Sequence, residues 1–194
     1  MTPQVVFLLE ELSAAELLEA LLPKLFPGLS FLCVPHNGKS NLKQSIPRKL
    51  RAWKDANTRF VVLIDQDNDD CLALKRELVQ LCHRAGRPDT IVRIVCRELE
   101  AWYLGDPHAM AQAFDDPTLV QRVKRSQRLS NPDLVVKPSE EVKRLVPSFG
   151  KVSGARAIGD KLDPKRNRSH SFGVFIQALI QITCASSDTD ASIE

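Results

Sequence analysis

The sequence predicts an α/β fold, in which a mostly parallel sheet is flanked by helices and a small helical elaboration follows toward the C-terminus. Two observations carry this prediction. Short apolar runs rich in β-branched residues, such as those at 5–9 and 60–64, are typical of strands buried on both faces. Amphipathic segments of helical length lie between these runs, and such an alternation favours a doubly wound α/β arrangement.

Four strands and three helices are expected to alternate along the N-terminal half. We predict strands at about 4–10, 29–34, 59–64 and 90–96, and helices at about 13–25, 41–53 and 70–85. A capping box formed by Ser13 and Glu16 starts the first helix. Pro47 predicts a kink or a break in the second helix, and Asp70 is expected to cap the third.

The rest of the chain reads as helical. The segment at 97–104 starts a helix in which Trp102 and Tyr103 are expected in the core. A weaker, polar helical pattern follows at 106–146, and an apolar terminal helix is predicted at 172–182. We therefore predict an α/β core at 1–105, a helical elaboration at 106–184 that packs on it within the same domain, and a flexible tail at 185–194.

Composition excludes several classes of protein. Apolar residues make up 43% and charged residues 26% of the 194 residues, which is ordinary for a soluble domain. No apolar run is long enough to span a membrane, and the N-terminus lacks a signal pattern. The five cysteines have no CxxC spacing, so we expect reduced, buried thiols in a cytoplasm. The net charge of +3 is modest, but the basic residues cluster at 43–54, 122–128 and 161–168.

Two acidic clusters each follow an apolar run, and they are the most informative feature of the chain. Glu10 and Glu11 follow the first strand, and Asp65 and Asp67 follow the third. Ligands of open α/β sheets bind beyond the carboxyl ends of the strands, so these carboxylates are expected to converge. In an extended strand exit, Asp65 and Asp67 would point the same way. A hard cation such as Mg²⁺ or Mn²⁺ would relieve their mutual repulsion.

The sequence does not match the pattern of a phosphate-binding P-loop or that of a calcium-binding EF-hand. Gly38-Lys39-Ser40 resembles the end of a P-loop, but the glycine required five residues earlier is Cys33. Lys39 then either lies in a plain polar loop or contacts a substrate phosphate. The loop from Asp65 lacks the glycine and the glutamate of a calcium-binding EF-hand.

Three further groups have both a functional and a structural interpretation. Glu98 and Glu100 follow the fourth strand, and they either join the acidic site or complement a helix N-terminus. Lys151 and Arg156 lie in a glycine-containing stretch, where they either stabilise charge on a phosphate or belong to a solvated loop. The same two alternatives hold for Arg168 within 166–170.

The glutamate after the first strand and the Asp-x-Asp after the third resemble a Toprim domain, the metal-dependent fold of topoisomerases, primases and OLD-type nucleases. Together with Arg97-Glu98-Leu99-Glu100-Ala101-Trp102 and the segment at 166–172, they resemble an uncharacterised bacterial Toprim-like family often encoded beside AAA/ABC-type ATPases.

The resemblance implies a role for particular residues. Glu10 takes the place of the catalytic glutamate, Asp65 and Asp67 those of the metal ligands, and Glu98 and Lys151 are candidates to complete a two-metal site. Toprim domains usually have glycine after the glutamate, and Glu11 stands there instead. Either Glu10 or Glu11 therefore faces the metal. Lys39, Arg156 and Arg168 are the candidate substrate-binding residues.

The sequence thus predicts a Mg²⁺-dependent nuclease, or a related phosphodiester-cleaving subunit of an ATPase-linked defence or toxin-like system. Its expected partners are nucleic acid, an AAA/ABC-type ATPase and a second copy of the chain, with no membrane. One alternative is a catalytically silent subunit that docks on an ATPase. The other is a receiver-like phosphoacceptor, in which Asp65 is phosphorylated and Lys137 supplies the cation.

Overall fold

The computed structural model describes residues 4–190, and it has a four-stranded parallel sheet at its centre. The strand order is β2-β1-β3-β4. The strands are β1 (Val5–Leu9), β2 (Phe31–Pro35), β3 (Arg59–Asp65) and β4 (Ile91–Val95). In the register, Val5 lies opposite Phe31 on one side and Arg59 on the other. The expected α/β fold with a mostly parallel sheet is confirmed.

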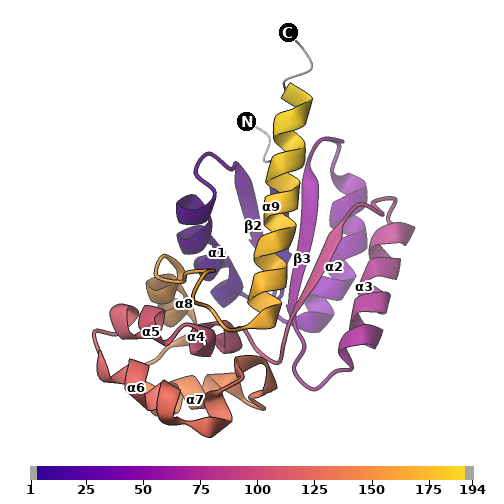
Figure 1. The fold of residues 1–194 in the computed structure, drawn as a ribbon. Coiled ribbons are helices and arrows are strands. Elements are labelled where there is room, and N and C mark those ends of the chain that lie inside the picture. Colours follow the sequence, from indigo (N-terminus) through magenta and orange to yellow (C-terminus); the bar gives the residue numbers. More distant parts are fainter. Residues whose placement is uncertain (1–3, 191–194) are drawn as a thin grey trace.

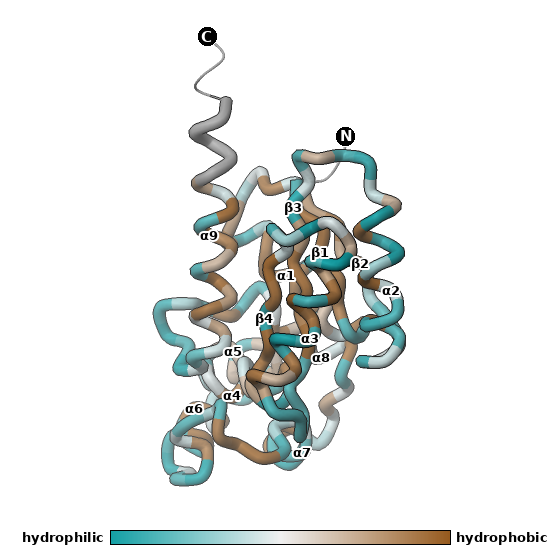
Figure 2. Tube along the Cα trace, turned by 90° about the vertical axis from the view of Figure 1, so that its right-hand side faces the viewer, coloured by the Kyte–Doolittle hydropathy of each residue, from teal (hydrophilic) through white to brown (hydrophobic). Residues whose placement is uncertain are grey.

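Helices cover both faces of the sheet (Figure 1). One face is covered by α1 (Leu12–Leu25) and α9 (His170–Asp190), and the other by α2 (Lys39–Ala52) and α3 (Cys71–Arg84). Successive side chains of a strand point to opposite faces, so Phe7 joins the first core and Leu8 the second. Figure 2 shows the result, with hydrophobic strands inside and a largely hydrophilic α2 outside.

The remaining helices lie near the carboxyl ends of the strands (Figure 1). They are α4 (Glu100–Gly105), α5 (Pro107–Ala113), α6 (Thr118–Arg125), the 3₁₀ turns η1 (Gln127–Leu129) and η2 (Pro132–Leu134), α7 (Pro138–Leu145) and α8 (Lys151–Gly159). Their apolar side chains belong to the same cluster as α1 and α9. This continuity supports the prediction that the elaboration and the core form one domain.

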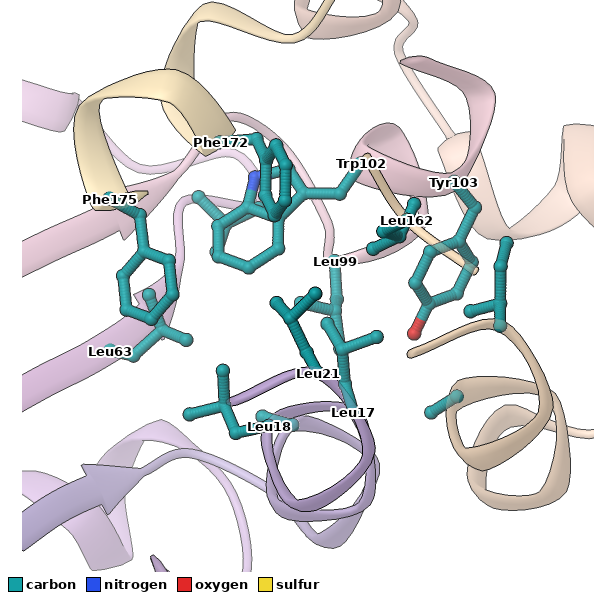
Figure 3. Close-up of a cluster of buried hydrophobic side chains, with 14 of the residues drawn as sticks. Leu17, Leu18, Leu21, Leu63, Leu99, Trp102, Tyr103, Leu162, Phe172 and Phe175 are labelled. Carbon is teal, nitrogen blue, oxygen red and sulfur yellow. The ribbon is translucent and has the colours of Figure 1, made fainter. Parts of the chain in front are cut away.

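Trp102 and Tyr103 anchor this arrangement, as expected from the sequence. Both are buried, and the Trp102 ring lies 5.1 Å from that of Phe172 and 5.2 Å from that of Phe175. Figure 3 shows these rings packed over leucines of α1. The short helix α4 is thereby fixed against α9.

The structure corrects two predictions about helix α1 and helix α2 and confirms one about helix α3. Glu11, not Ser13, is the N-cap of α1, and the Ser13 hydroxyl donates to the Glu11 carboxylate at 2.5 Å, so the capping box does not form. Pro47 lies inside the continuous helix α2 and does not break it. The Asp70 cap is confirmed, since its carboxylate accepts from the Ala73 N–H at 2.6 Å.

Two predictions about the C-terminal part and the thiols also need revision. Helix α9 runs to Asp190, so it includes most of the segment predicted as a tail, and 191–194 lie outside the described residues. No disulfide joins the cysteines within the described residues, but Cys82 is buried, Cys184 is exposed and the other three lie in between. Among the described helices, none combines the length and apolar character needed to cross a bilayer.

Candidate active site

The acidic residues lie where the direction of the sheet connections reverses. Helix α1 leaves β1 toward one face, and α3 leaves the neighbouring β3 toward the other. Such a switch point opens a crevice at the carboxyl ends of the strands, where ligands of α/β sheets bind. Glu10 follows β1 and Asp65 ends β3, so both lie at this crevice.

The structure brings Glu10 and Asp65 together. The Asp65 N–H donates to Glu10 Oε2 at 3.1 Å, and Asp65 Oδ2 in turn accepts from the Leu99 N–H at 3.2 Å. Burial raises the pKa of Asp65 well above its usual range, and the nearby Glu100, Glu10 and Glu11 raise it further. Burial also raises the pKa of Glu10. These carboxyl groups therefore lie in a place where negative charge is poorly compensated.

Glu100 joins Glu10 and Asp65 as the third carboxyl group of this site, whereas the sequence prediction had named Glu98 as the further ligand. Glu100 is 1% exposed, and its Oε2 has no hydrogen-bond partner among the described residues. Burial raises its pKa to about 7 even though Lys151 lies close enough to oppose the rise. The signal in the sequence was its place directly before Ala101-Trp102-Tyr103, because a helix buried on every side must also bury its first residue.

Glu98 has a structural contact instead. Its Oε2 accepts from the Ser139 N–H at 2.7 Å, in the first turn of α7. A carboxylate at this position satisfies a free N–H and complements the positive end of the helix dipole. Glu98 still lies near enough to raise the pKa of Glu100. It holds α7 against the site and is replaced by Glu100 as the candidate ligand.

Lys151 is the cation on the α8 side of the site. It is the first residue of α8, and its Nζ lies 3.3 Å from Glu11 Oε1. Partial burial lowers the pKa of Lys151, but Glu100, Glu11 and Asp65 outweigh that effect and raise it. Because Glu11 binds Lys151 and Ser13, Glu10 is the glutamate that faces Asp65.

Asp67 does not point the same way as Asp65. Strand β3 ends at Asp65, and Asp67 has a left-handed backbone with φ of 53°, so the rule for extended strands does not apply. Lys39, the first residue of α2, lies 2.9 Å from Asp67 and 2.8 Å from Asp69. Asp67 is 48% exposed yet near enough to raise the pKa of Glu10. It lies at the rim of the site, paired with Lys39.

The two candidate arginines make structural contacts. Arg156 forms a bidentate pair with Glu16, at 2.6 and 2.7 Å, which joins α8 to α1. Arg168 donates to the carbonyl groups of Ser130 and Leu104, at 2.8 and 3.0 Å. Their guanidinium groups are thus bound by the fold itself, and Lys39 and Lys151 are the cations that adjoin the acidic site.

The donor set fits a hard divalent cation in its chemistry. Glu10, Asp65 and Glu100 offer oxygen atoms only, which is what Mg²⁺ and Mn²⁺ prefer. Glu100 Oε2 is also a buried acceptor without a donor. Among the described residues, no three acidic, histidine or cysteine side chains already stand in a metal-ligating arrangement. Side-chain rotation would therefore have to accompany binding.

Fold and site together define a Toprim-like α/β domain with an acidic centre at its switch point. The chain belongs to the family described as "Domain of unknown function (DUF4276)", whose model matches residues 9–180. Its structure is similar to the C-terminal region of the Burkholderia pseudomallei OLD protein, with a TM-score of 0.59 at 18% identity over 95% of this chain and 99% of that one. No curated protein sequence matches it significantly. The expected kinship, an uncharacterised family with an OLD-like fold, is confirmed.

Proposed function

We propose that this protein is a Mg²⁺-dependent nuclease, which cleaves phosphodiester bonds at the acidic centre. The observation that carries the proposal is the convergence of Glu10, Asp65 and the buried Glu100 at the carboxyl ends of the strands, with few cations nearby. Burying several carboxyl groups is costly unless a cation compensates them. The similarity of the fold to a region of an OLD protein is consistent with this chemistry.

The residues divide into two roles in this proposal. Glu10, Asp65 and Glu100 would hold the ion, which would supply an activated water and neutralise charge on the phosphate. Lys151 lies on the α8 side of the carboxyl groups and Lys39 at the rim on the α2 side. Ammonium groups fixed at these places attract a phosphodiester and stabilise the negative charge that grows during in-line attack.

Metal binding tests the proposal first. We expect Mn²⁺ or Mg²⁺ at about one hundred times its Kd to stabilise the protein by about 2.7 kcal/mol, measured by denaturant unfolding. Glu10→Gln and Asp65→Asn should abolish the stabilisation, and the exposed Glu19→Gln should keep it. Equal stabilisation of all four proteins would contradict the proposed centre.

Cleavage tests the reaction itself. With Mg²⁺ present, we expect cut DNA or RNA, and a loss on the order of 100-fold in Glu10→Gln and Asp65→Asn. Glu19→Gln is again the control. If neither metal binding nor cleavage is found, the protein is a silent interaction subunit, the main alternative.

The geometry does not favour a receiver-like phosphoacceptor. Lys137, the cation that this alternative requires, is exposed and pairs with Glu140 at 2.6 Å in the first turn of α7. The cation that the phosphoacceptor alternative needs is therefore paired elsewhere, and the acidic centre fits metal binding better.

We further propose that the chain works in the cytoplasm, in an ATPase-linked defence system and as a homodimer. The resemblance of its motifs to a family encoded beside AAA/ABC-type ATPases supports the partner. Light scattering on the chain alone, and again with an ATPase encoded beside it, measures both associations. A chain that stays monomeric and does not bind such an ATPase would contradict both proposed associations.

A further inference from the structure

A cavity adjoins the acidic centre on the side of β4. Its volume is about 610 Å³, within the range of about 300–1,000 Å³ that is usual for ligand pockets. It opens between the loops that follow β3 and β4, the turn η2 and the start of α9. The residues that matter most in its wall are Gln66, Cys96, Arg97, Asn131, Leu134 and His170.

The cavity is linked to the proposed reaction centre through the loop that follows β3. Gln66 lines it and follows Asp65 in the chain. Two backbone hydrogen bonds join the two loops, from Gln66 N–H to Val95 O at 2.9 Å and from Asp67 N–H to Arg97 O at 2.7 Å. A molecule in the cavity therefore contacts the segment that presents Asp65.

The charge of the cavity favours an anion. Arg97 donates to Asp67 O at 3.1 Å but makes no ion pair within the described part of the chain, and Arg168, although bound to carbonyl groups, adds a second positive charge to the wall. Asp133 is the acidic residue of the wall, but its carboxylate accepts from the Ser169 hydroxyl at 2.6 Å and the Ser171 N–H at 3.0 Å. It caps the long helix α9, where the helix dipole offsets part of its charge, and Arg97 and Arg168 leave the wall with an excess of positive charge.

The wall also offers what a nucleobase needs. Leu134 is a large apolar side chain that is 73% exposed, and Arg97 presents a planar guanidinium group. Bases stack on such surfaces, and amide groups such as the Asn131 NH₂ bind base edges. Arg97 has φ of 62°, a costly backbone for arginine. Strain of this kind is common in ligand sites.

We propose that this cavity binds the nucleotide next to the cleaved phosphodiester, with its base unstacked and its phosphate toward the acidic centre. The inference rests on the proposed nuclease function and adds the form of the substrate. A base that is paired and stacked in a duplex cannot enter a cavity of this size without being extruded. The substrate class is therefore single-stranded nucleic acid, or an unpaired end or loop.

The test is a titration of fluorescent oligonucleotides, followed by anisotropy in EDTA, so that binding does not depend on the metal. We expect the single strand to bind at least about tenfold more tightly than the duplex of the same sequence. Leu134→Glu and Arg97→Asn should each weaken single-strand binding about tenfold. Asparagine tolerates the left-handed backbone at this position, so folding is not penalised.

Matched controls separate a local effect from a change of net charge. Val136→Glu, at a residue 67% exposed on the same segment but outside this cavity, and Arg125→Asn, at an exposed residue of α6, should bind as the wild type does. Parallel DNA and RNA strands report the sugar preference. Tighter duplex binding, no binding at all, or equal losses in variants and controls would overturn the cavity proposal.

Cleavage assays on the same proteins distinguish the two proposals. If Mg²⁺-dependent cleavage is seen but Leu134→Glu and Val136→Glu cut single strands equally, the cavity proposal fails and the nuclease stands. If the cavity binds single strands as described but no metal supports cleavage, the nuclease proposal fails.

Discussion

The carboxyl group of Glu100 is buried, near Lys151 and the acidic residues Glu98, Glu11 and Asp65. Such a group lowers stability unless it is protonated or paired. Natural sequences keep groups of this kind where a function requires them, and perturbed titration is common at functional sites. Ionised Glu100 therefore lowers the stability of the folded protein, although the proposed metal site requires its carboxylate.

The pH dependence of stability follows from the pKa of Glu100. Its pKa rises from 4.5 in the unfolded chain to about 7 in the folded one, so between these values the folded state binds more protons. The contribution of protonated Glu100 to the stability of the folded state is then complete below pH 4.5, and it is lost as the pH rises through about 7. At about 1.4 kcal/mol for each pKa unit, the loss approaches about 3 kcal/mol.

We therefore expect Glu100→Gln to unfold at higher denaturant than the wild type at pH 8, with the difference shrinking toward pH 5. Measurements in EDTA keep any bound cation from masking the effect. Glu19→Gln, at an exposed position, serves as the control. A Glu100→Gln variant that is less stable than the wild type at pH 8 would contradict the predicted burial cost.

Residue types near strand ends predicted the position of the site but not every member. Glu10 and Asp65 were recognised because the topology of a parallel sheet brings strand ends together. Glu98 was preferred to Glu100 because the sequence does not reveal that α7 packs on α4 and offers the Ser139 N–H to Glu98. Asp67 was predicted to point the same way as Asp65. Its left-handed backbone turns the side chain in another direction, and the spacing of the two residues in the sequence does not reveal this.

At the scale of elements, the contact between α1 and α8 fixes the position of Lys151. Gly159 lies where a Cβ atom would be 2.6 Å from Ala20 Cβ and 2.7 Å from Leu17 O. The two helices approach this closely because glycine has no side chain. The Arg156–Glu16 pair joins the same two helices. Helix α8 thereby presents its first residue, Lys151, to Glu11.

Gly159→Ala should separate α1 from α8 and cost about 1–3 kcal/mol in the free energy of unfolding, as overpacked cores do. Gly173→Ala is the matched control, because no atom lies within 4 Å of the added Cβ in α9. It should gain about 0.5–1 kcal/mol from the lower entropy of the unfolded chain. Denaturant unfolding of both variants measures the contrast, and equal stabilities would contradict the close approach.

Element types were easier to predict than their ends. Buried strands and amphipathic helices differ in period, so all four strands and the alternating helices were found. Their ends depend on tertiary contacts. The start of α1 is set by Glu11, and α9 continues to Asp190, well past its predicted end. The packing that decides such ends is invisible to a local pattern.

For the whole molecule, the sheet is shared by two hydrophobic cores. Alternate residues of β1 and β3 enter one core or the other, so neither core can form unless the sheet does. The larger core extends through the helical elaboration to α5, α6 and α7. The molecule is therefore expected to unfold as one cooperative unit, including the predicted elaboration at 106–184.

The two tryptophans test this cooperativity, because each reports one core. Trp53 packs edge-on against Phe60 at 5.6 Å in the α2–α3 core, and Trp102 is buried in the other. In Trp53→Phe the fluorescence comes from Trp102, and in Trp102→Phe it comes from Trp53. We expect the fluorescence midpoint of each variant to coincide with its own circular dichroism midpoint during urea unfolding. Because the strands supply side chains to both cores, loss of either one removes the partner surface of the other. Separate midpoints in either variant would show that the cores unfold independently, and the prediction of a single domain would then be wrong.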